Sequence, residues 1–171
     1  MNKTTHPACF FTATNLNWLP LLKPDSHKDI ILTSLSFLQR DERITLYAFV
    51  IMPNHIHLIW QPYGEHLPKK IQHSFLKYTA QQIKFELLKN NPAELEQFKV
   101  DAADREYQFW ERNPLSIELY QEKVFLQKLN YLHRNPVKAG LCKYPEEYRY
   151  SSARFYETGV DDWGILNHYR G

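Results

Sequence analysis

The sequence predicts an α+β fold of the ferredoxin-like, split βαβ type: an antiparallel sheet with helices on one face and a C-terminal helix across the other. Strand-like and helix-like stretches follow one another in the order strand, helix, strand, strand, helix, strand, which is the order of this fold. The length of 171 residues matches one domain and suffices to bury a core. Aromatic residues at 15% argue against disorder. We therefore expect a single domain over residues 1–171.

The first strand and the first helix follow from local composition. Residues 8–18, ACFFTATNLNW, mix aromatic, β-branched and polar side chains and end before Pro20, as strands do. Residues 25–39 have the apolar spacing of an amphipathic helix, and Asp25 and Ser26 are its candidate N-caps. We expect this helix to pack on the core.

Two histidines mark the third strand. Residues 44–51 and 55–61 are rich in aliphatic and aromatic side chains and are joined by a short turn, so they predict the second and third strands. Alternate side chains of a strand share one face, which puts His55 and His57 together and Ile56 on the other side. Two neutral imidazoles in this position can share a divalent metal, although an ordinary polar sheet face would also explain them. The topology makes this strand central in the sheet.

The second predicted helix, residues 67–89, carries a stripe of lysines. Lys70, Lys77 and Lys84 recur every seven residues, close to two helical turns, and therefore lie along one side. Such a stripe either faces solvent or contacts the phosphates of a nucleic acid.

The last predicted strand and helix follow an insertion. Residues 90–106 are acidic and polar, and we interpret them as an insertion with one short helix near residues 93–98. Residues 107–111 predict the fourth strand. A helix is predicted over residues 117–135, because Pro136 disfavours helical geometry in the residue before it.

This final helix has one polar stripe. Gln127, Tyr131 and Asn135 are spaced by four residues and share a helix face, beside the apolar Leu129 and Leu132. If the helix crosses the open face of the sheet, Tyr131 comes to lie over the two histidines.

Four sequence blocks occur in a fixed order: HIH at residues 55–57, FW at 109–110, YLHRNPVKAGL at 131–141 and YRYSSAR at 148–154. This ordered set resembles the REP-associated tyrosine transposases, which belong to the single-tyrosine HUH transposases. The resemblance extends from Phe10 to about Tyr156. Family members often have a glycine pair just before the first strand, where this chain has His6 and Pro7.

The resemblance implies a metal-dependent transposase or nickase that cleaves and rejoins single-stranded, hairpin-containing DNA through a 5′-phosphotyrosine. It implies that Tyr131 is the nucleophile and that His55, His57 and Asn135 hold a divalent metal. Mg²⁺ or Mn²⁺ suits imidazole and amide donors together with phosphate oxygens. A metal would also compensate for the weak nucleophilicity of a phenol, whose ordinary pKa is about 10.

Further cations are candidate DNA contacts. Lys128 lies one helical turn before Tyr131, and Arg149 and Arg154 follow it in the YRYSSAR block. Together with the lysine stripe, they could contact the DNA backbone. The family includes swapped dimers and monomers, and the sequence leaves a homodimer open.

Composition excludes several other classes. No glycine occurs before Gly64, which argues against an N-terminal phosphate-binding loop or dinucleotide fingerprint. Cys9 and Cys142 fit neither a disulfide framework nor a CxxC motif, so we expect free thiols. No signal peptide and no membrane-spanning stretch is recognisable, and we expect a cytoplasmic protein with no membrane partner. The formal net charge of +2 is only weakly informative.

Two other functions fit parts of the sequence. A non-catalytic nucleic-acid-binding module of the same fold would stack bases on sheet aromatics, but it would not need the histidine pair together with Tyr131 and Asn135. A metal-dependent hydrolase would use water and leave Tyr131 structural. Covalent trapping of DNA separates the hydrolase from the transposase.

Overall fold

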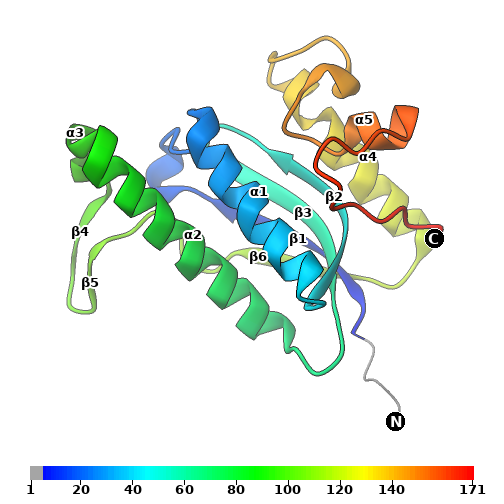
Figure 1. The fold of residues 1–171 in the computed structure, drawn as a ribbon, viewed down its shortest axis with the longest axis horizontal. Helices are drawn as coiled ribbons and strands as arrows, with labels where there is room; N and C mark the ends of the chain where they lie inside the picture. Colours follow the sequence, from blue (N-terminus) through cyan, green and yellow to red (C-terminus); the bar gives the residue numbers. More distant parts are fainter. Residues whose placement is uncertain (1–5) are drawn as a thin grey trace.

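Four antiparallel strands in the order β2-β3-β1-β6 form the sheet that organises the chain (Figure 1). The computed structural model describes residues 6–171, so residues 1–5 of the predicted domain lie outside the described residues. The predicted fold class is confirmed, with β1 and β3 in the centre of the sheet. The strands of this sheet are β1 (Ala8–Thr14), β2 (Ile44–Ile51), β3 (His55–Pro62) and β6 (Leu115–Leu119).

Helices cover both faces of the sheet. Two long helices lie side by side across one face, and a third long helix crosses the other (Figure 1). The first two are α1 (Asp25–Arg40) and α2 (Pro68–Asn90), and the third is α4 (Glu122–Lys138). The shorter elements are α3 (Pro92–Leu95), α5 (Ala153–Thr158) and the 3-10 turns η1 (Leu16–Trp18), η2 (Glu96–Phe98) and η3 (Pro145–Glu147).

Alternation along the central strands divides the apolar side chains between two cores. Phe11 and Leu58 are fully buried beneath α1 and α2. Their neighbours Phe10 and Ile59 lie on the opposite face and pack with Leu132 of α4. Full burial of one such side chain contributes roughly 1.5–3 kcal/mol, so both helical layers stabilise the sheet.

The fourth strand is not where the sequence placed it. The strand is β6, whereas residues 107–111 form only a single bridge to the sheet, between Trp110 and Asn15. Phe109 and Trp110 are nevertheless buried, and the Trp110 indole donates to Thr79 Oγ1 of α2 at 3.2 Å. This stretch is therefore apolar because it fills the core beside α2, which the pattern alone does not distinguish from a strand.

The insertion contains more structure than the sequence predicts. The short helix near residues 93–98 corresponds to α3 and η2. A separate two-stranded hairpin follows, formed by β4 (Lys99–Ala102) and β5 (Arg105–Tyr107). Its strands are too short and polar to give a recognisable alternation.

The predicted ends of two helices are also wrong. α4 begins at Glu122 and continues through Pro136 to Lys138. It ends in a Schellman motif in which Gly140, at φ 75°, donates to Val137 O and Leu141 donates to Pro136 O. A proline thus lies inside the last turns, and a glycine ends the helix.

At the start of α1, Pro24 occupies the N-cap position, with no side-chain cap. Neither Asp25 nor Ser26 is therefore the N-cap. Asp25 instead forms an ion pair with Lys28 one turn later, at 3.7 Å.

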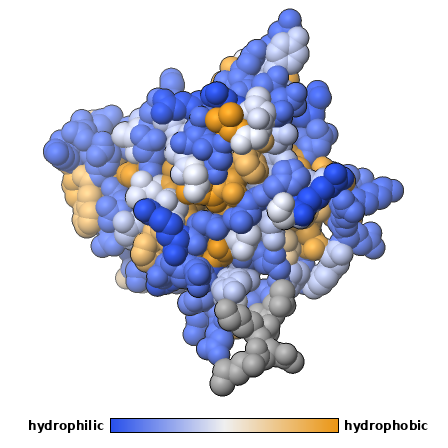
Figure 2. Space-filling view, turned by 45° about the vertical axis from the view of Figure 1, so that its right-hand side comes forward, coloured by the Kyte–Doolittle hydropathy of each residue, from blue (hydrophilic) through white to orange (hydrophobic). Residues whose placement is uncertain are grey.

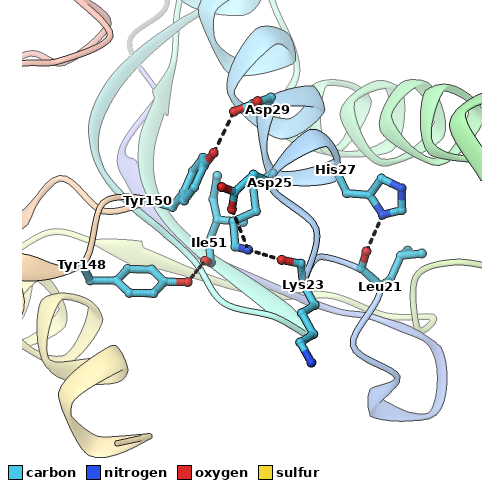
Figure 3. A network of polar contacts seen from close by, with 9 residues as sticks. Leu21, Lys23, Asp25, His27, Asp29, Ile51, Tyr148 and Tyr150 are labelled. Atoms are coloured by element: carbon cyan, nitrogen blue, oxygen red, sulfur yellow. Dashed lines mark hydrogen bonds and ion pairs between the residues drawn. The ribbon is translucent and has the colours of Figure 1, made fainter. Parts of the chain in front are cut away.

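The C-terminal YRYSSAR block is hydrogen-bonded to β2 and α1 (Figure 3). The Tyr148 hydroxyl donates to Ile51 O at 2.6 Å, and the Tyr150 hydroxyl donates to Asp29 Oδ1 at 3.0 Å. Ser151 forms a β-bridge with Val50. These two tyrosines are used in packing, which leaves neither ring free to stack on a base.

The surface in Figure 2 is largely hydrophilic, with small apolar patches between polar side chains. No helix within residues 6–171 combines the length and the apolar character needed to cross a bilayer. Cys9 and Cys142 are free thiols, as predicted.

Candidate active site

The two histidines of β3 face α4. Register pairs His57 with Thr12 and His55 with Thr14, while Ile56 joins the core on the other face of the sheet. The imidazole centroids are 4.8 Å apart, with the rings nearly perpendicular. Period-two alternation in a central strand therefore brings both rings to one spot.

His57 is held on several sides. Its ring stacks on Phe10 at 5.3 Å, and its Nδ1 lies 2.7 Å from Thr12 Oγ1. Asn135 Nδ2 lies 3.3 Å from His57 Nε2. An amide nitrogen can only donate, so Nε2 accepts, and the ring proton on Nδ1 is donated to Thr12. Burial lowers the pKa of His57 to about 3, helped by the nearby His55 and Lys128.

His55 is arranged in the same way. Its Nδ1 lies 2.7 Å from Asn54 Oδ1, which can only accept, so Nδ1 carries the proton and Nε2 keeps its lone pair. Burial lowers the pKa of His55, and a hydrogen bond with the Asn135 side chain offsets part of this effect. Both imidazoles are therefore neutral at pH 7, with the lone pair on Nε2, and the lone pair of His57 accepts from Asn135 Nδ2 in this structure.

α4 brings the predicted tyrosine and asparagine to these rings. The Tyr131 ring is 5.5 Å from that of His57 and 6.1 Å from that of Phe10, and Tyr131 is 49% exposed. Asn135, one turn later, contacts both histidines. The buried Leu129 and Leu132 hold this helix against the sheet. Helix and histidines belong to one chain, so this arrangement needs no second copy.

The donor set fits a divalent metal. Within residues 6–171, no three His, Cys, Asp or Glu side chains form a cluster, so a metal held by the two histidines would take Asn135 as its third protein donor. Both imidazoles are neutral and oriented through Nδ1 by Thr12 and Asn54, which is how metal-binding histidines are usually held. Three neutral donors leave room for phosphate oxygens and for the charge of the ion.

Lys128 adds positive charge at the same place. Its Nζ lies 5.1 Å from the centroid of the Phe10 ring and 5.9 Å from that of Tyr131. The ammonium group is therefore near the half-exposed Tyr131.

The lysine stripe is remote from this site. Lys70, Lys77 and Lys84 lie on α2, which covers the other face of the sheet, and Lys84 sits over the Tyr107 ring at 5.3 Å. An open groove of about 970 Å³ runs between α2 and residues 104–114. Its lining includes the cations Lys69, Lys77, Arg105 and Arg112 and the carboxylates of Asp104 and Glu111. Asp104 pairs with Arg105 at 2.9 Å and with Arg112 at 4.0 Å.

The two arginines of the YRYSSAR block also have other partners. Arg154 pairs with Asp162 at 3.5 Å, and the Arg149 guanidinium lies over the Tyr150 ring at 5.5 Å. Among the described residues, no contact joins either arginine to Tyr131 or the histidines.

Sequence reasoning missed three residues at the site. Thr12 and Asn54 orient the histidines, and Trp18 lies with its ring 6.2 Å from that of His55. Asn54 directly precedes His55, so its position was a readable signal. Thr12 lies at the site because β1 pairs with β3, and Trp18 lies there because the chain turns after β1. No local sequence pattern predicts either arrangement.

Fold and site together define the class of protein. It is an α+β protein in which a helix crosses one face of the sheet and places a tyrosine beside two histidines. A comparison with family models finds no match, and neither does one with curated proteins. Several solved structures resemble this fold, including the following two. One is a REP-associated tyrosine transposase bound to a REP hairpin, with a TM-score of 0.64 and 18% identity over 100% of this chain and 94% of that one. The other is a candidate transposase from Deinococcus radiodurans R1, with a TM-score of 0.52 and 13% identity over 78% of this chain and 94% of that one. At the level of fold, these likenesses confirm the resemblance noted in the sequence.

Proposed function

We propose that this protein is a metal-dependent transposase or nickase that cleaves and rejoins single-stranded DNA through a covalent link to Tyr131. The observation that carries the proposal is the meeting of Tyr131 with two neutral, oriented histidines and Asn135 across the sheet face. A ferredoxin-like binding module would have no need of this arrangement. The fold shared with a transposase solved on a REP hairpin supports the same conclusion.

The cleavage step exchanges one phosphodiester bond for another. The Tyr131 oxygen attacks phosphorus and forms a phosphorus–oxygen bond, while the bond between phosphorus and the 3′ oxygen breaks. The phenol loses its proton and the departing 3′ oxygen gains one, so the products are a 5′-phosphotyrosine and a free 3′-hydroxyl. Reversal by the same or another 3′-hydroxyl rejoins the DNA with little net change in bond energy.

His55, His57 and Asn135 would hold the divalent metal, Mg²⁺ or Mn²⁺. When bound, it would polarise the scissile phosphate and help to neutralise charge in the transition state. Thr12 and Asn54 hold the proton of each ring on Nδ1, which leaves the lone pair on Nε2. To join them as a ligand, Asn135 would turn its amide oxygen toward the ion in place of the Nδ2 that donates to His57. Lys128, whose Nζ lies 5.9 Å from the centroid of the Tyr131 ring, would supply further positive charge to a phosphate bound near the nucleophile.

The DNA substrate combines an unpaired strand with a hairpin. Half of Tyr131 is exposed, which leaves the nucleophile open to a strand laid across the site. The cations of the α2 groove, with Lys70 nearby, could contact the backbone of the paired stem. Arg149 and Arg154 are exposed and could make further backbone contacts.

The test uses a pool of hairpin oligonucleotides with randomised single-stranded flanks, labelled at either the 5′ or the 3′ end. With Mn²⁺, we expect a 3′-labelled strand to become attached to the protein and to survive denaturing electrophoresis. A 5′-labelled strand should give a free, shorter product. Both signals should disappear with chelator, and the adduct should disappear in Tyr131→Phe.

Two substitutions serve as controls. Tyr78→Phe removes a hydroxyl of similar exposure on α2, on the other side of the sheet, and should leave the adduct intact. His66→Ala removes an exposed histidine and should do the same, unlike His57→Ala. Cleavage without an adduct in both wild type and Tyr131→Phe would support the hydrolase, and tight binding without cleavage would support the binding module.

A further inference from the structure

We propose that Trp18 is a stacking platform for an unpaired DNA base beside the scissile phosphate. This inference rests on the proposed function and deepens it, because it assigns the residue that positions the strand at the metal-binding end of the site. The ligand it would take is a single-stranded nucleotide, recognised through the flat face of its base.

Trp18 differs from the other tryptophans. It is 63% exposed, whereas Trp60 and Trp110 are buried in the core. Trp163 packs against Phe49 at 5.5 Å and Tyr150 at 6.1 Å. Trp18 is therefore the one tryptophan that presents a free indole surface to solvent.

The indole lies directly beside the site. Its centroid is 6.2 Å from that of His55, with the rings at 67°. A stacked strand rises roughly 3.4 Å per nucleotide, so this ring lies within about two nucleotides of a phosphate bound at His55. Asn54 connects the two, because its Oδ1 faces His55 Nδ1 while its Nδ2 lies 3.5 Å from Trp18 O.

The backbone around Trp18 is held in an unfavourable conformation. Asn17 and Trp18 have φ values of 54° and 57°, in the left-handed region that side chains disfavour. The segment is fixed there by hydrogen bonds from Asn17 N to Glu111 Oε1 at 2.7 Å and from Trp18 N to Asn15 O at 3.0 Å.

Folding alone does not explain this arrangement. A large apolar ring gains little from so exposed a position, and strain of this kind collects at sites that must hold a group ready for a ligand. Because its backbone is already held, this segment also loses less conformational freedom when a base stacks on the ring. Asn17, directly before Trp18, donates from its backbone N to Glu111 Oε1, and Glu111 lines the groove, so the segment that holds Trp18 also contacts the groove.

The first test measures stacking by fluorescence. The protein is prepared with Tyr131→Phe so that no strand is cut, and it is titrated with the tightest-binding hairpin of the pool in Mg²⁺. Because Trp18 is the exposed indole, binding should quench its emission, and Trp18→Leu should abolish the quenching. Trp18→Leu should also weaken binding by about tenfold, whereas Trp18→Phe should stay within about threefold.

The second test locates the base. Abasic nucleotides are placed one at a time along the single-stranded flank. At one position, the lesion should weaken binding to the Trp18 protein by about tenfold and have no effect on Trp18→Leu, since the partner is already missing. Phe37→Leu, which removes an exposed ring on α1, should retain the full abasic effect.

The outcomes separate this inference from the proposed function. If Trp18→Leu, in the Tyr131 protein, binds and forms the adduct as wild type does, and no abasic position depends on Trp18, the stacking platform is wrong and the transposase remains. If quenching and the abasic effect depend on Trp18 but no adduct ever forms, the platform stands and the proposed catalysis is wrong. If Trp18→Leu fails to fold, Trp18→Phe replaces it as the comparison. The quenching and the abasic scan are then measured in the Trp18 protein and in Trp18→Phe, and an absence of both effects in the Trp18 protein would overturn the inference.

Discussion

Neutral histidine nitrogens with a fixed orientation are the central feature at the scale of single residues. A ring nitrogen can bind a metal only through a free lone pair, and the hydrogen bond at the opposite nitrogen decides which one that is. For His57 this bond goes to Thr12, on the neighbouring strand. Thr12 would therefore influence a metal bound at His57 without touching it.

Thr12→Val tests this role with a side chain of nearly the same shape. It removes the oxygen opposite His57 Nδ1, so the ring loses its fixed tautomer. We expect binding of Mn²⁺, measured by calorimetric titration, to weaken by about tenfold or more. Thr14→Val is the matched control, since Thr14 lies opposite His55 on the same strand and forms no side-chain hydrogen bond within residues 6–171. Equal affinity in the two variants would contradict the role of Thr12.

Residue-scale prediction succeeded where spacing within one element decides the geometry. His55 with His57 follows from the strand period, and Tyr131 with Asn135 follows from the helix period. The structure brings all four together. Thr12 is 45 residues from His57 and could not be found, because its role depends on the register between two strands.

At the scale of elements, the position of α4 decides whether Tyr131 meets the histidines. The buried His133 fastens this helix, because its Nε2 lies 2.7 Å from Ser152 Oγ, which also accepts a hydrogen bond from Phe49 N at 3.0 Å. Burial lowers the pKa of His133 to about 4, so the ring is neutral at pH 7. One hydroxyl therefore joins α4, β2 and the C-terminal segment.

Ser152→Ala should loosen this junction. It leaves the Phe49 amide and the His133 ring without their partner in a buried position, and we expect the free energy of unfolding to fall by roughly 1–3 kcal/mol. Urea denaturation monitored by circular dichroism measures this difference. Ser74→Ala, at an exposed position of α2, should change stability by less than about 0.5 kcal/mol. A Ser152→Ala protein as stable as Ser74→Ala would exclude the junction as a stabilising contact.

The errors in predicting elements have one physical origin. The aromatic residues of 107–111 predict a strand, although they fill the core beside α2, and the edge strand is instead β6. For α4, Pro136 was given more weight than Gly140, although a helix tolerates a proline when the missing hydrogen bond is outweighed by packing. Tertiary packing determines both the position of the fourth strand and the end of α4, and local sequence propensity carries no information about this packing.

At the scale of the whole molecule, the sheet separates two surfaces. α4 and the candidate active site lie on one side, and α2 with its lysines and the cationic groove lies on the other. Because the net charge is only +2, any binding of DNA would depend on where the positive charges lie on the surface. Glu111 lines the groove and accepts a hydrogen bond from Asn17 N, in the segment that also contains Trp18.

The free energy of unfolding should fall at alkaline pH because two tyrosines that are not exposed, Tyr148 and Tyr150, must ionise. Burial raises the pKa of Tyr148 to about 12, and burial together with the hydrogen bond to Asp29 raises the pKa of Tyr150 to about 12. Both values exceed the ordinary value of about 10. A raised pKa in the folded state means that stability is fully present below pH 10 and is lost as the pH rises toward 12.

Urea unfolding at a series of pH values between about 8 and 12 measures this loss. The Tyr148→Phe, Tyr150→Phe double variant should be less stable at pH 8, because it lacks two hydrogen bonds, but its stability should fall less steeply with pH. Tyr78→Phe, an exposed position, should keep the slope of the wild type. A double variant with an unchanged slope would show that other groups control alkaline unfolding.

The most direct measurement of the central claim is mass spectrometry of the protein after reaction with the hairpin pool in Mn²⁺. Trypsin cuts after Lys128 and Arg134 and releases residues 129–134, LNYLHR, which contain Tyr131 as their only tyrosine. After nuclease digestion, we predict that this peptide carries the mass of a 5′-phosphorylated nucleotide, in a metal-dependent manner. Cleaved DNA with this peptide unmodified, or with the nucleotide on another tyrosine, would contradict the account.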